Sequence, residues 1–444
     1  MAEGTAVTDA SSDLGTEAVG LLQRLIRTNT VNPPGNERAL QEELAQLLSA
    51  AGFECELLAA EPERSNLVAR LRGRSEGPTL TLLGHVDTVR ADPSDWSRDP
   101  WSGDLIEGEV WGRGALDMKG QVAAELAACL ELGRSGWRPA GELLLVLTAD
   151  EEAGGDLGAR WLCEQHPDKV RSDMVINEGG GVTIDHQGRR LYTLSVGEKG
   201  IFRVRLRVAG RAGHASLPRI GDNALLKLAP LLTRIGEQPP PEPTEEGLAF
   251  LSALYGERFE GAAGMEAGLE RLRRDQPLLA AFLAEPMLSV TLSPTKARAG
   301  EKVNVIPAAA EALIDCRVPP GLGTDEARAR IESLLGDGEY ELEFSEAVVG
   351  NRSALESPLT EAIREWLAEV EPGAELAPIV MPGFSDSHWF RKAFDSAVVY
   401  GFCPHRVSVL EAAPLIHGAD ERVPAADIEL AARFFSDLPR RLLR

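Results

Sequence analysis

Carboxylates and imidazoles stand directly after short apolar runs of this sequence, where side chains can hold a metal ion or activate water. His85 and Asp87 follow the apolar run Thr79–Leu83. Because successive side chains alternate across a strand, residues two apart share one face. A carboxylate in that position can fix the tautomer of a metal-bound imidazole. The same spacing also fits a strand-end histidine with a salt-bridge partner, so this pair alone leaves both interpretations open.

Two further segments carry acids in turns. Asp117 lies in the sequence WGRGALDMKG before a predicted helix, where an isolated aspartate also fits a helix N-cap. Gly112 and Gly114 suggest a dinucleotide-binding loop, but Asp117 takes the place of the third glycine and no strand leads cleanly into the segment, which argues against a nicotinamide dehydrogenase. Three consecutive acids, 150–152, follow the apolar run Glu142–Thr148. They repel one another unless cations or water neutralise them, so the alternatives are a metal site and a solvated acidic loop.

The last two segments are NEGGG, with Glu178, and HGADE, with His417. Together the five segments supply two histidines and three or four carboxylates, most of them at predicted strand ends. Nitrogen and oxygen ligands without thiolate suit a hydrolytic zinc, manganese or cobalt centre.

Strands that alternate with helices must position these residues. The sequence predicts buried strands at Thr79–Leu83, Glu142–Thr148 and Asp173–Ile176, with helices at Met118–Leu132 and Gly158–Gln165. Such alternation is typical of an α/β domain, in which helices flank a mostly parallel sheet on both faces. Ligands bind such sheets outside the carboxyl ends of the strands.

The pattern changes near Leu194, which predicts a smaller α+β domain inserted into the α/β domain. Arg203–Val208 alternates polar and apolar residues as a half-exposed strand does. Helical segments fill Gly247–Ala284, and strands are expected at Met287–Leu292 and Ala309–Asp315. We assign residues 1–194 and 347–444 to the catalytic domain and residues 195–346 to the inserted domain, two units that suit a chain of 444 residues.

Composition restricts the partners and the compartment. The net charge of −23 repels phosphate backbones, so we expect no nucleic-acid partner. No apolar run is long enough to cross a bilayer, and no basic segment followed by an apolar one predicts secretion. The five cysteines are scattered and form no CxxC, as expected for buried thiols in a reducing compartment. These features predict a cytoplasmic protein without a membrane partner.

The combination of HVD, GALDMKG, DEEAGG, NEGGG and IHGADE resembles the M20 family of metallopeptidases, with all motifs in the family's order over nearly the whole chain. That family includes aminoacylase-1, carboxypeptidases of the G and S types, acetylornithine deacetylase and succinyl-diaminopimelate desuccinylase. The resemblance implies a zinc-peptidase-like catalytic domain with an inserted lid and dimerisation domain. It also implies a cofactor of two Zn²⁺ ions, with Co²⁺ or Mn²⁺ as alternatives.

The resemblance assigns a role to each matching position. The implied ligands are His85, Asp117 and Glu178 for one metal, and Asp117, Glu152 and His417 for the other, with Asp117 bridging. Glu151 corresponds to the general base and Asp87 to the partner of His85. In such a site two metals share a water whose pKa can fall to about 7. Glu151 would take the proton of that water and give it to the leaving amine.

The inserted domain and a late loop carry further matches. The resemblance implies that His214, in GRAGHAS, stabilises the oxyanion, often from across a dimer interface; the sequence leaves open whether the chain is a monomer or a homodimer through the inserted domain. It implies substrate contacts for Asn304 and Arg317, in NVIPAAAEALIDCR, and for Gly383 and Ser385, in PGFSDSHWF. Arginine suits a carboxylate because its planar fork binds both oxygens, although Arg317 also fits a strand-end salt bridge.

The expected function is hydrolysis of an amide bond in a small molecule or dipeptide that bears a free carboxylate. This class covers a dipeptidase or carboxypeptidase and, equally, an N-acyl-amino-acid deacylase. The alternative is a non-catalytic metal-binding or scaffolding protein that retains the fold. Loss of a ligand or of the base would indicate that alternative, and none is missing from the sequence.

Overall fold

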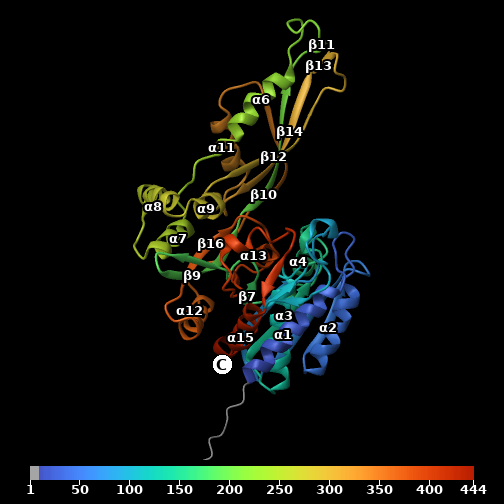
Figure 1. The fold of residues 1–444 in the computed structure, drawn as a ribbon, viewed down its shortest axis with the longest axis vertical. Helices are drawn as coiled ribbons and strands as arrows, with labels where there is room; N and C mark the ends of the chain where they lie inside the picture. Colours follow the sequence, from blue (N-terminus) through green and yellow to red (C-terminus); the bar gives the residue numbers. More distant parts are fainter. Residues whose placement is uncertain (1–9) are drawn as a thin grey trace, which may run out of the picture.

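The structure, a computed structural model, describes residues 10–444, with side chains described from Leu14 onward. Figure 1 shows two parts: a larger α/β part that contains both ends of the described chain, and an elongated part that extends away from it. The larger part holds the motifs at strand ends, and the elongated part contains the strands β10, β12 and β14, described below.

A mixed sheet of nine strands forms the centre of the larger part. In spatial order its strands are β1 (Glu54–Ala59), β2 (Ser65–Arg72), β6 (Ala140–Thr148), β3 (Ser75–His85), β7 (Met174–Asn177), β17 (Val398–Gly401), β9 (Arg189–Glu198) and β16 (Glu375–Met381), with β8 (Thr183–His186) paired to β9. The central strands β6, β3, β7 and β17 run parallel, whereas β1 and β2 join antiparallel. The predicted α/β class is confirmed, and the three predicted strands form the interiors of β3, β6 and β7.

Helices cover both faces of this sheet because its strands are apolar on both sides. Leu80 and Leu82 point to one face of β3 and Leu83 to the other, in two separate hydrophobic clusters. The first face carries α1 (Ala10–Arg27), α2 (Arg38–Ala50), α3 (Lys119–Arg134), α12 (Pro358–Val370) and α15 (Ala425–Leu442). Helix α3, predicted from its apolar run, is buried along almost its whole length. The second face carries α4 (Ala159–Gln165), α5 (Pro167–Val170) and α13 (Ser387–Ala393).

A group of helices from the middle of the chain packs on the far end of the same sheet. These are α7 (Glu245–Tyr255), α8 (Gly261–Asp275), α9 (Pro277–Leu279), the π-helical turn η3 (Ala280–Ala284) and α10 (Glu285–Leu288). Phe250 and Leu254 of α7 join Ile379 of β16 and Leu191 of β9 in one hydrophobic cluster. Helices were predicted here, but within the span 195–346, and the structure places them on the catalytic sheet beside β9 and β16 (Figure 1).

The elongated part, which we call the lid, is built on an antiparallel sheet of four strands. Their order is β12 (Thr291–Ala299), β14 (Ala309–Val318), β10 (Gly200–Ala209) and β15 (Glu341–Val348), with α6 (Ala224–Ile235) and α11 (Thr324–Leu335) on one face. The predicted alternation in Arg203–Val208 is confirmed, since the apolar residues of β10 face the helices and the arginines face outward. The strand predicted at Met287–Leu292 is wrong in its first half, because Met287 and Leu288 close a helix that packs beside β16.

Short elements complete the chain. A small sheet contains β4 (Leu105–Ile106), β5 (Glu109–Trp111) and β18 (Arg422–Pro424), a two-stranded ribbon contains β11 (Gly213–His214) and β13 (Val305–Ile306), and single turns form η1 (Pro93–Asp95), η2 (Glu151–Ala153) and α14 (Val409–Ala412). All five cysteines are free. Within residues 10–444 no helix combines the length and apolarity that a membrane span requires.

Candidate metal centre

The five predicted ligands come from distant parts of the chain and meet at one edge of the central sheet. His85 ends β3, Glu152 lies in η2 just after β6, and Glu178 follows β7. Because β6, β3 and β7 are adjacent parallel strands, their carboxyl ends lie side by side. Asp117 arrives from the loop before α3, and His417 from the turn after α14.

Asp117 stands at the middle of this group. Its Oδ1 lies 3.2 Å from Nε2 of His85, and its Oδ2 lies 3.1 Å from Nε2 of His417. Nε2 of His417 is also 3.1 Å from Oε2 of Glu152, and Nε2 of His85 is 3.7 Å from Oε1 of Glu178. One carboxylate therefore presents a different oxygen to each imidazole, which is the arrangement of a bridging ligand between two cations.

Glu151 lies among the same groups. Its Oε2 is 3.8 Å from Nε2 of His85, and ligand atoms of Glu151, Glu178 and His85 all lie within 4.8 Å of one another. A second such set contains His85, Asp117 and Glu152. Glu151 shares the space with the predicted ligands, and its separate role as general base rests on the resemblance of its motif.

The electrostatics of the group favour cations. Burial raises the pKa of Glu151 and of Glu178 well above the usual range, and neighbouring carboxylates add to the shift. Burial opposes ionisation of Asp117 as well, but its contacts with the two imidazoles hold its pKa below the usual range. Contacts with Asp117 and Glu152 raise the pKa of His417 to about 10. Closely spaced, poorly solvated carboxylates of this kind are stabilised by divalent cations.

Asp87, which was predicted to orient the imidazole of His85, also contacts the turn that carries Glu151 and Glu152. Nδ1 of His85 lies 3.0 Å from the backbone carbonyl of Asp87 and 3.5 Å from its Oδ1. The carboxylate of Asp87 also accepts the backbone N–H of Glu151 and that of Glu152, each at 3.2 Å. The buried Asn32 donates to Oδ2 of Asp87 at 2.8 Å. One side chain thus holds both the imidazole of one predicted ligand and the turn that carries the acids.

A layer of charged residues behind the ligands was not predicted. Asp150, a neighbour of Glu151 with a positive φ of 67°, accepts hydrogen bonds from Asn32 at 3.1 Å and from Arg64 at 2.9 Å. Arg64 also donates to both oxygens of the fully buried Glu37, at 2.7 and 2.9 Å. These residues brace the acidic turn. The sequence indicated Asp150 only as part of the run of three acids. No motif or spacing indicated Asn32, Arg64 or Glu37.

Glu421 supports the bridging aspartate in the same way. This buried carboxylate accepts the backbone N–H groups of Leu116 and Asp117 at 2.7 and 3.0 Å, and that of Gly114 at 3.0 Å. Arg113 donates to it at 2.7 Å and to the backbone carbonyl of Gly418 at 2.7 Å. Glu421 thereby joins the loop of Asp117 to the turn of His417. Its place in the HGADE motif was the only sequence signal for this role.

His214 and Asn304 lie together, but not at this edge of the sheet. They belong to the ribbon β11–β13, where His214 pairs with Val305 and the carbonyl of Asn304 accepts the N–H of Ala215. The ribbon stands at the far tip of the lid (Figure 1). Strand β10 covers ten residues between the lid base and this tip, so at about 3.3 Å per residue the ribbon is roughly 30 Å from the base. Both side chains are exposed.

The imidazole of His214 is oriented as a hydrogen-bond donor. Its Nδ1 accepts the backbone N–H of Ser216 at 3.2 Å and lies 2.7 Å from the hydroxyl of the same residue. A neutral imidazole whose Nδ1 accepts carries its proton on Nε2. On this exposed side chain Nε2 then carries the proton, as an oxyanion donor requires.

The other predicted substrate residues lie near the lid base. Arg317 pairs with Ile201 next to the start of β10, and its Nε donates to Asp315 at 2.7 Å. Gly383 is partly exposed in the loop after β16, whereas Ser385 is buried in that loop. The structure therefore divides the predicted substrate residues between the base and the tip of the lid.

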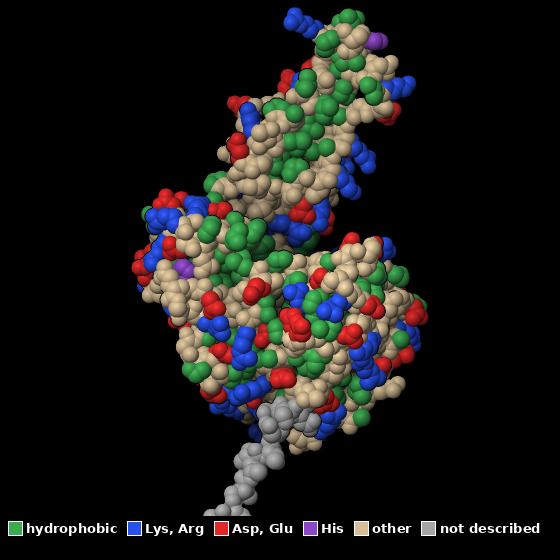
Figure 2. Space-filling model, viewed as in Figure 1, with side chains coloured by type: hydrophobic (Ala, Val, Ile, Leu, Met, Phe, Trp, Pro, Cys, Tyr) green, Lys and Arg blue, Asp and Glu red, His purple; other side chains and the backbone are tan. Residues whose placement is uncertain are grey.

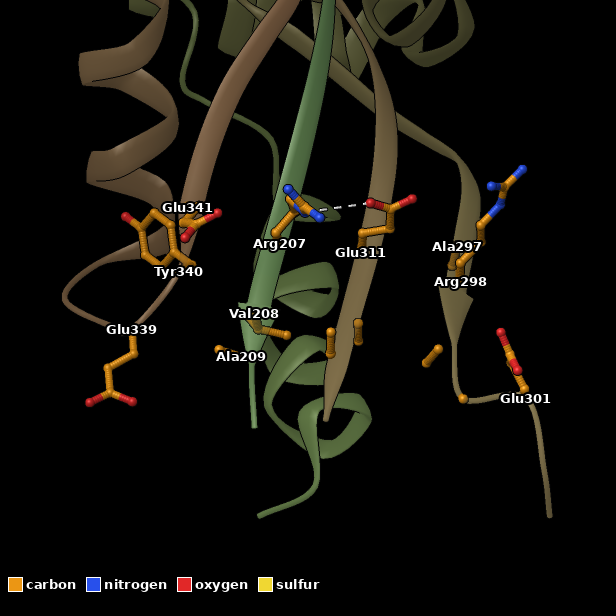
Figure 3. Close-up of a pocket in the computed structure, with 14 residues that line it drawn as sticks. Arg207, Val208, Ala209, Ala297, Arg298, Glu301, Glu311, Glu339, Tyr340 and Glu341 are labelled. Atoms are coloured by element: carbon orange, nitrogen blue, oxygen red, sulfur yellow. Dashed lines mark ion pairs between the residues drawn. The ribbon is translucent and has the colours of Figure 1, made fainter. Parts of the chain in front are cut away.

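A cavity of the described chain lies elsewhere, away from the predicted ligands. It has a volume of about 1030 Å³ and lies against the lid sheet at the ends of β10, β12, β14 and β15. Figure 3 shows that its charged side chains are arginines and glutamates, accompanied by the hydroxyl of Tyr340. Arg207 and Glu311 form an ion pair of 3.6 Å. No histidine or cysteine lines it. The convergence of ligand atoms at the sheet edge, and not the size of a cavity, identifies the chemical site.

Comparison with known proteins agrees with this geometry. The sequence model of peptidase family M20/M25/M40 matches residues 81–441. A succinyl-diaminopimelate desuccinylase of Thioalkalivibrio sulfidiphilus (strain HL-EbGR7) is 27% identical over 436 residues, covering 96% of this chain and 99% of that protein. The probable carboxypeptidase S-like 2 of Dictyostelium discoideum is 26% identical over 392 residues, covering 84% and 73%. The crystal structure of an M20 family metallo-carboxypeptidase from Sulfolobus solfataricus matches the fold with a TM-score of 0.70 at 19% identity, covering 96% of this chain and 99% of that one.

Proposed function

The chain belongs to peptidase family M20/M25/M40 and is a hydrolase of amide or peptide bonds, and from this premise we propose that it is a two-zinc enzyme for small, carboxylate-bearing substrates. The observation that carries the proposal is the position of Asp117, whose two carboxylate oxygens each face a different imidazole. Two sets of donors with one shared carboxylate suit a pair of divalent cations.

The side chains present fit two such cations. His85, Asp117 and Glu178 would hold one, and Asp117, Glu152 and His417 the other. All donors are nitrogen or oxygen, which suits Zn²⁺ and also Co²⁺ or Mn²⁺. When bound, the cations supply Lewis-acid chemistry for amide hydrolysis.

Glu151 would move the proton of the reaction. Its carboxylate lies beside His85 and Glu178, where it can take a proton from water and return it to a leaving group. We propose that Glu151 accepts a proton from the attacking water and gives it to the amide nitrogen as the C–N bond breaks. Asp87 contributes by fixing the N–H groups of the acidic turn.

The substrate class follows from the base of the lid. Arg317 donates to Asp315 from its Nε at 2.7 Å and from its Nη2 at 3.5 Å, and we propose that its other amino group, Nη1, binds a substrate carboxylate. The loop with Gly383 is proposed to border the same carboxylate. The names of the two relatives describe a desuccinylase and a carboxypeptidase-like protein, and accordingly both an N-acyl amino acid and a dipeptide are candidate substrates.

We further propose that the enzyme is a homodimer in which the lid tip of one copy completes the site of the other. His214 stands at that tip and cannot reach its own metal centre in the structure described here (Figure 1). Exposed apolar side chains surround it; they are Leu217, Ile220, Leu225, Leu226, Val303 and Val305, which we call the tip surface. Figure 2 shows hydrophobic side chains along the lid towards its end. Exposed apolar side chains of this kind suit contact with another protein chain.

A pair of substitutions at neighbouring residues tests the central proposal. Zinc- or cobalt-loaded protein is screened on dipeptides and N-acyl amino acids, and Glu151→Ala is compared with Glu152→Ala. We expect Glu151→Ala to abolish turnover with two metals still bound, and Glu152→Ala to lose metal, as measured by elemental analysis. Glu76→Ala, at an exposed glutamate, is the matched control. Full activity of Glu151→Ala would overturn the mechanism, and no hydrolysis by the wild type would favour a metal-binding or scaffolding protein.

A further inference from the structure

The junction between the catalytic part and the lid contains two charged side chains at consecutive positions. Strand β9 ends at Glu198 and β10 begins at Gly200, so Glu198 and Lys199 form the first crossing into the lid. Glu198 donates its N–H to the carbonyl of Asn351, in the segment by which the chain returns from β15. A Cβ on Gly200 would come within 2.4 Å of the carbonyl of Val348, so the two crossings are tightly packed against each other.

Lys199 holds a third crossing. Its ammonium group donates to the carbonyls of Pro286 and Ser289 at 2.8 Å each, and to the hydroxyl of Thr291 at 2.9 Å. These residues connect α10, on the catalytic sheet, with β12 of the lid. The N–H of Lys199 also donates to the carbonyl of Met381 at 3.0 Å, where β16 ends and the loop with Gly383 begins. The backbone of the junction is therefore bonded directly to the start of that loop.

The carboxylate of Glu198 holds the other end of the same loop. Its Oε2 accepts the N–H of Ser385 at 2.6 Å, and its Oε1 accepts the hydroxyl of Ser385 at 3.0 Å. Arg391 of α13 donates to Oε1 at 2.7 Å and neutralises the charge. Glu198 is 1% exposed and Ser385 is 1% exposed, so these bonds form without competition from bulk water.

From Ser385 the chain leads directly to the metal centre. Asp386 accepts the hydroxyl of Thr148 at 2.6 Å, at the end of β6. Ser387 accepts the side-chain amide of Asn177 at 2.9 Å, and Asn177 is the residue before the predicted ligand Glu178. The part of the loop that remains partly exposed is Pro382–Phe384. The N–H and hydroxyl of Ser385 both donate to Glu198, and its hydroxyl oxygen also accepts from Ser387 at 3.2 Å and from Asn177 at 3.4 Å, so this buried serine anchors the loop.

We propose that Glu198 is a positioning residue of the hydrolytic reaction, which ties the lid junction to the loop 382–386 and so fixes how Gly383 and Phe384 meet the substrate. The proposal rests on the proposed function for its kinetic readout. In this arrangement any turn of the lid about the junction moves Glu198, and through Ser385 it moves the loop. A purely structural ion pair with Arg391 would stabilise the fold without this effect on substrate binding.

The chain offers a matched control for the substitution. Glu131 of α3, like Glu198, accepts one serine hydroxyl and one arginine, namely Ser436 at 2.9 Å and Arg440 at 2.9 Å. Those partners lie on α15, in the helical layer on the other face of the sheet from α13. Glu131→Gln therefore removes the same kinds of bond without touching the loop.

The experiment compares Glu198→Gln, Ser385→Ala, the double variant and Glu131→Gln in the full-length, zinc-loaded protein. With the best substrate of the dipeptide and acyl-amino-acid screen, we expect Glu198→Gln to raise KM about tenfold, with a smaller change in kcat and with unchanged metal content. Ser385→Ala should raise KM in the same direction, and the double variant should show little further change because both act on one contact. Glu131→Gln should leave KM unchanged.

Hydrogen exchange gives a second measurement that needs no substrate. The amide of Ser385 should exchange faster in Glu198→Gln and in Ser385→Ala, and at the wild-type rate in Glu131→Gln. An unchanged KM and unchanged exchange in Glu198→Gln would overturn the proposal, as would an equal rise of KM in Glu131→Gln. If Glu198→Gln does not fold, the KM and the hydrogen-exchange rate of Ser385→Ala test the proposal in its place. Absence of hydrolysis by the wild type would count against the proposed function, and the exchange rates would still test the coupling.

Discussion

His214 acts from the second copy of the chain if the proposed dimer is correct, and two heterodimers distinguish this from action within one chain. The first heterodimer pairs a Glu151→Ala chain with a His214→Ala chain. The second pairs a wild-type chain with a chain that carries both substitutions. Both heterodimers contain the same two substitutions once each, so they differ only in whether the changes share a chain.

The expected activities follow from counting competent sites. If His214 acts across the interface, the first heterodimer has one complete site, because the chain that keeps Glu151 receives His214 from its partner. The second heterodimer then has none, because its wild-type chain receives alanine. The first should retain about half of the wild-type turnover per dimer. The second should fall by about 10²–10³-fold, the usual effect of losing one oxyanion donor.

The assay uses two affinity tags, one on each chain, so that co-expressed heterodimers are purified by two successive steps. Turnover is measured per dimer with the best substrate of the screen, and elemental analysis verifies that the metal content is equal. The structural basis of the expectation is that His214 is exposed and lies roughly 30 Å beyond the lid base. The reverse pattern, half activity in the second heterodimer and a collapse in the first, would refute action in trans.

Three further outcomes follow from the same geometry. Asp87→Asn should lower turnover or metal affinity about 10–100-fold. The reason is that an amide has only one oxygen to accept the two backbone N–H groups of Glu151 and Glu152. An unchanged rate and an unchanged metal content would contradict this prediction. Removal of metal by a chelator should lower the melting temperature, since cations at about 100 times their Kd stabilise the fold by about 2.7 kcal/mol, and a melting curve insensitive to chelation would count against the site. Glu125→Gln should stabilise the protein at neutral pH: Glu125 is fully buried with only Gln121 as partner, and burial raises its pKa well above 4.5. As the pH rises past 4.5, the carboxyl of Glu125 ionises in the unfolded chain before it ionises in the folded one, so the free energy of unfolding of the wild type should fall relative to that of the variant. If the difference between the two free energies stayed constant from pH 4.5 to 8, ionisation of Glu125 would not be its cause.

The meeting of His85, Glu152 and Glu178 at one edge of the sheet could be predicted because these residues follow a rule that operates on short segments. Buried parallel strands appear as apolar runs, and the residue after such a run lies at the edge where neighbouring strands also end. His85 and Glu178 follow adjacent strands of this kind, and Glu152 follows the next one. The rule needs no knowledge of the partners, since the parallel sheet itself brings the strand ends together.

The supporting residues escaped prediction for the opposite reason. Each of these residues forms hydrogen bonds with groups far away in the sequence, as Glu421, Asn32 and Arg64 do. A single polar residue in a loop belongs to no periodic pattern, so the sequence does not indicate its partner. Their common feature is burial without an apolar side chain, which only the tertiary structure reveals. Burial of such a charge is tolerated where its hydrogen bonds are satisfied, as they are for Glu421.

The helices between residues 245 and 288 show a different limit. Their apolar spacing predicts helices with one buried face, but it does not indicate which other part of the protein that face packs against. Phe250 meets Ile379 of the catalytic sheet, although the segment lies inside the span predicted as the inserted domain. The strand predicted at Met287 and Leu288 was wrong for a related reason, since a short apolar run fits a strand and a buried helix end equally well.

The predicted metal ligands and three of the predicted substrate residues lie in different parts of the fold. All five predicted ligands and Glu151 come from the catalytic part, braced by carboxylates such as Glu421 that also lie there, whereas His214, Asn304 and Arg317 come from the lid. A substitution in the lid should therefore change turnover or KM while both metals stay bound, and a substitution among the braces should change metal affinity first. Glu198 lies where these two systems meet, because its carboxylate reaches the substrate loop from the last residue before the lid. For Glu198, which lies in the catalytic part but contacts the loop 382–386, we therefore expect KM to respond while the metal content stays unchanged.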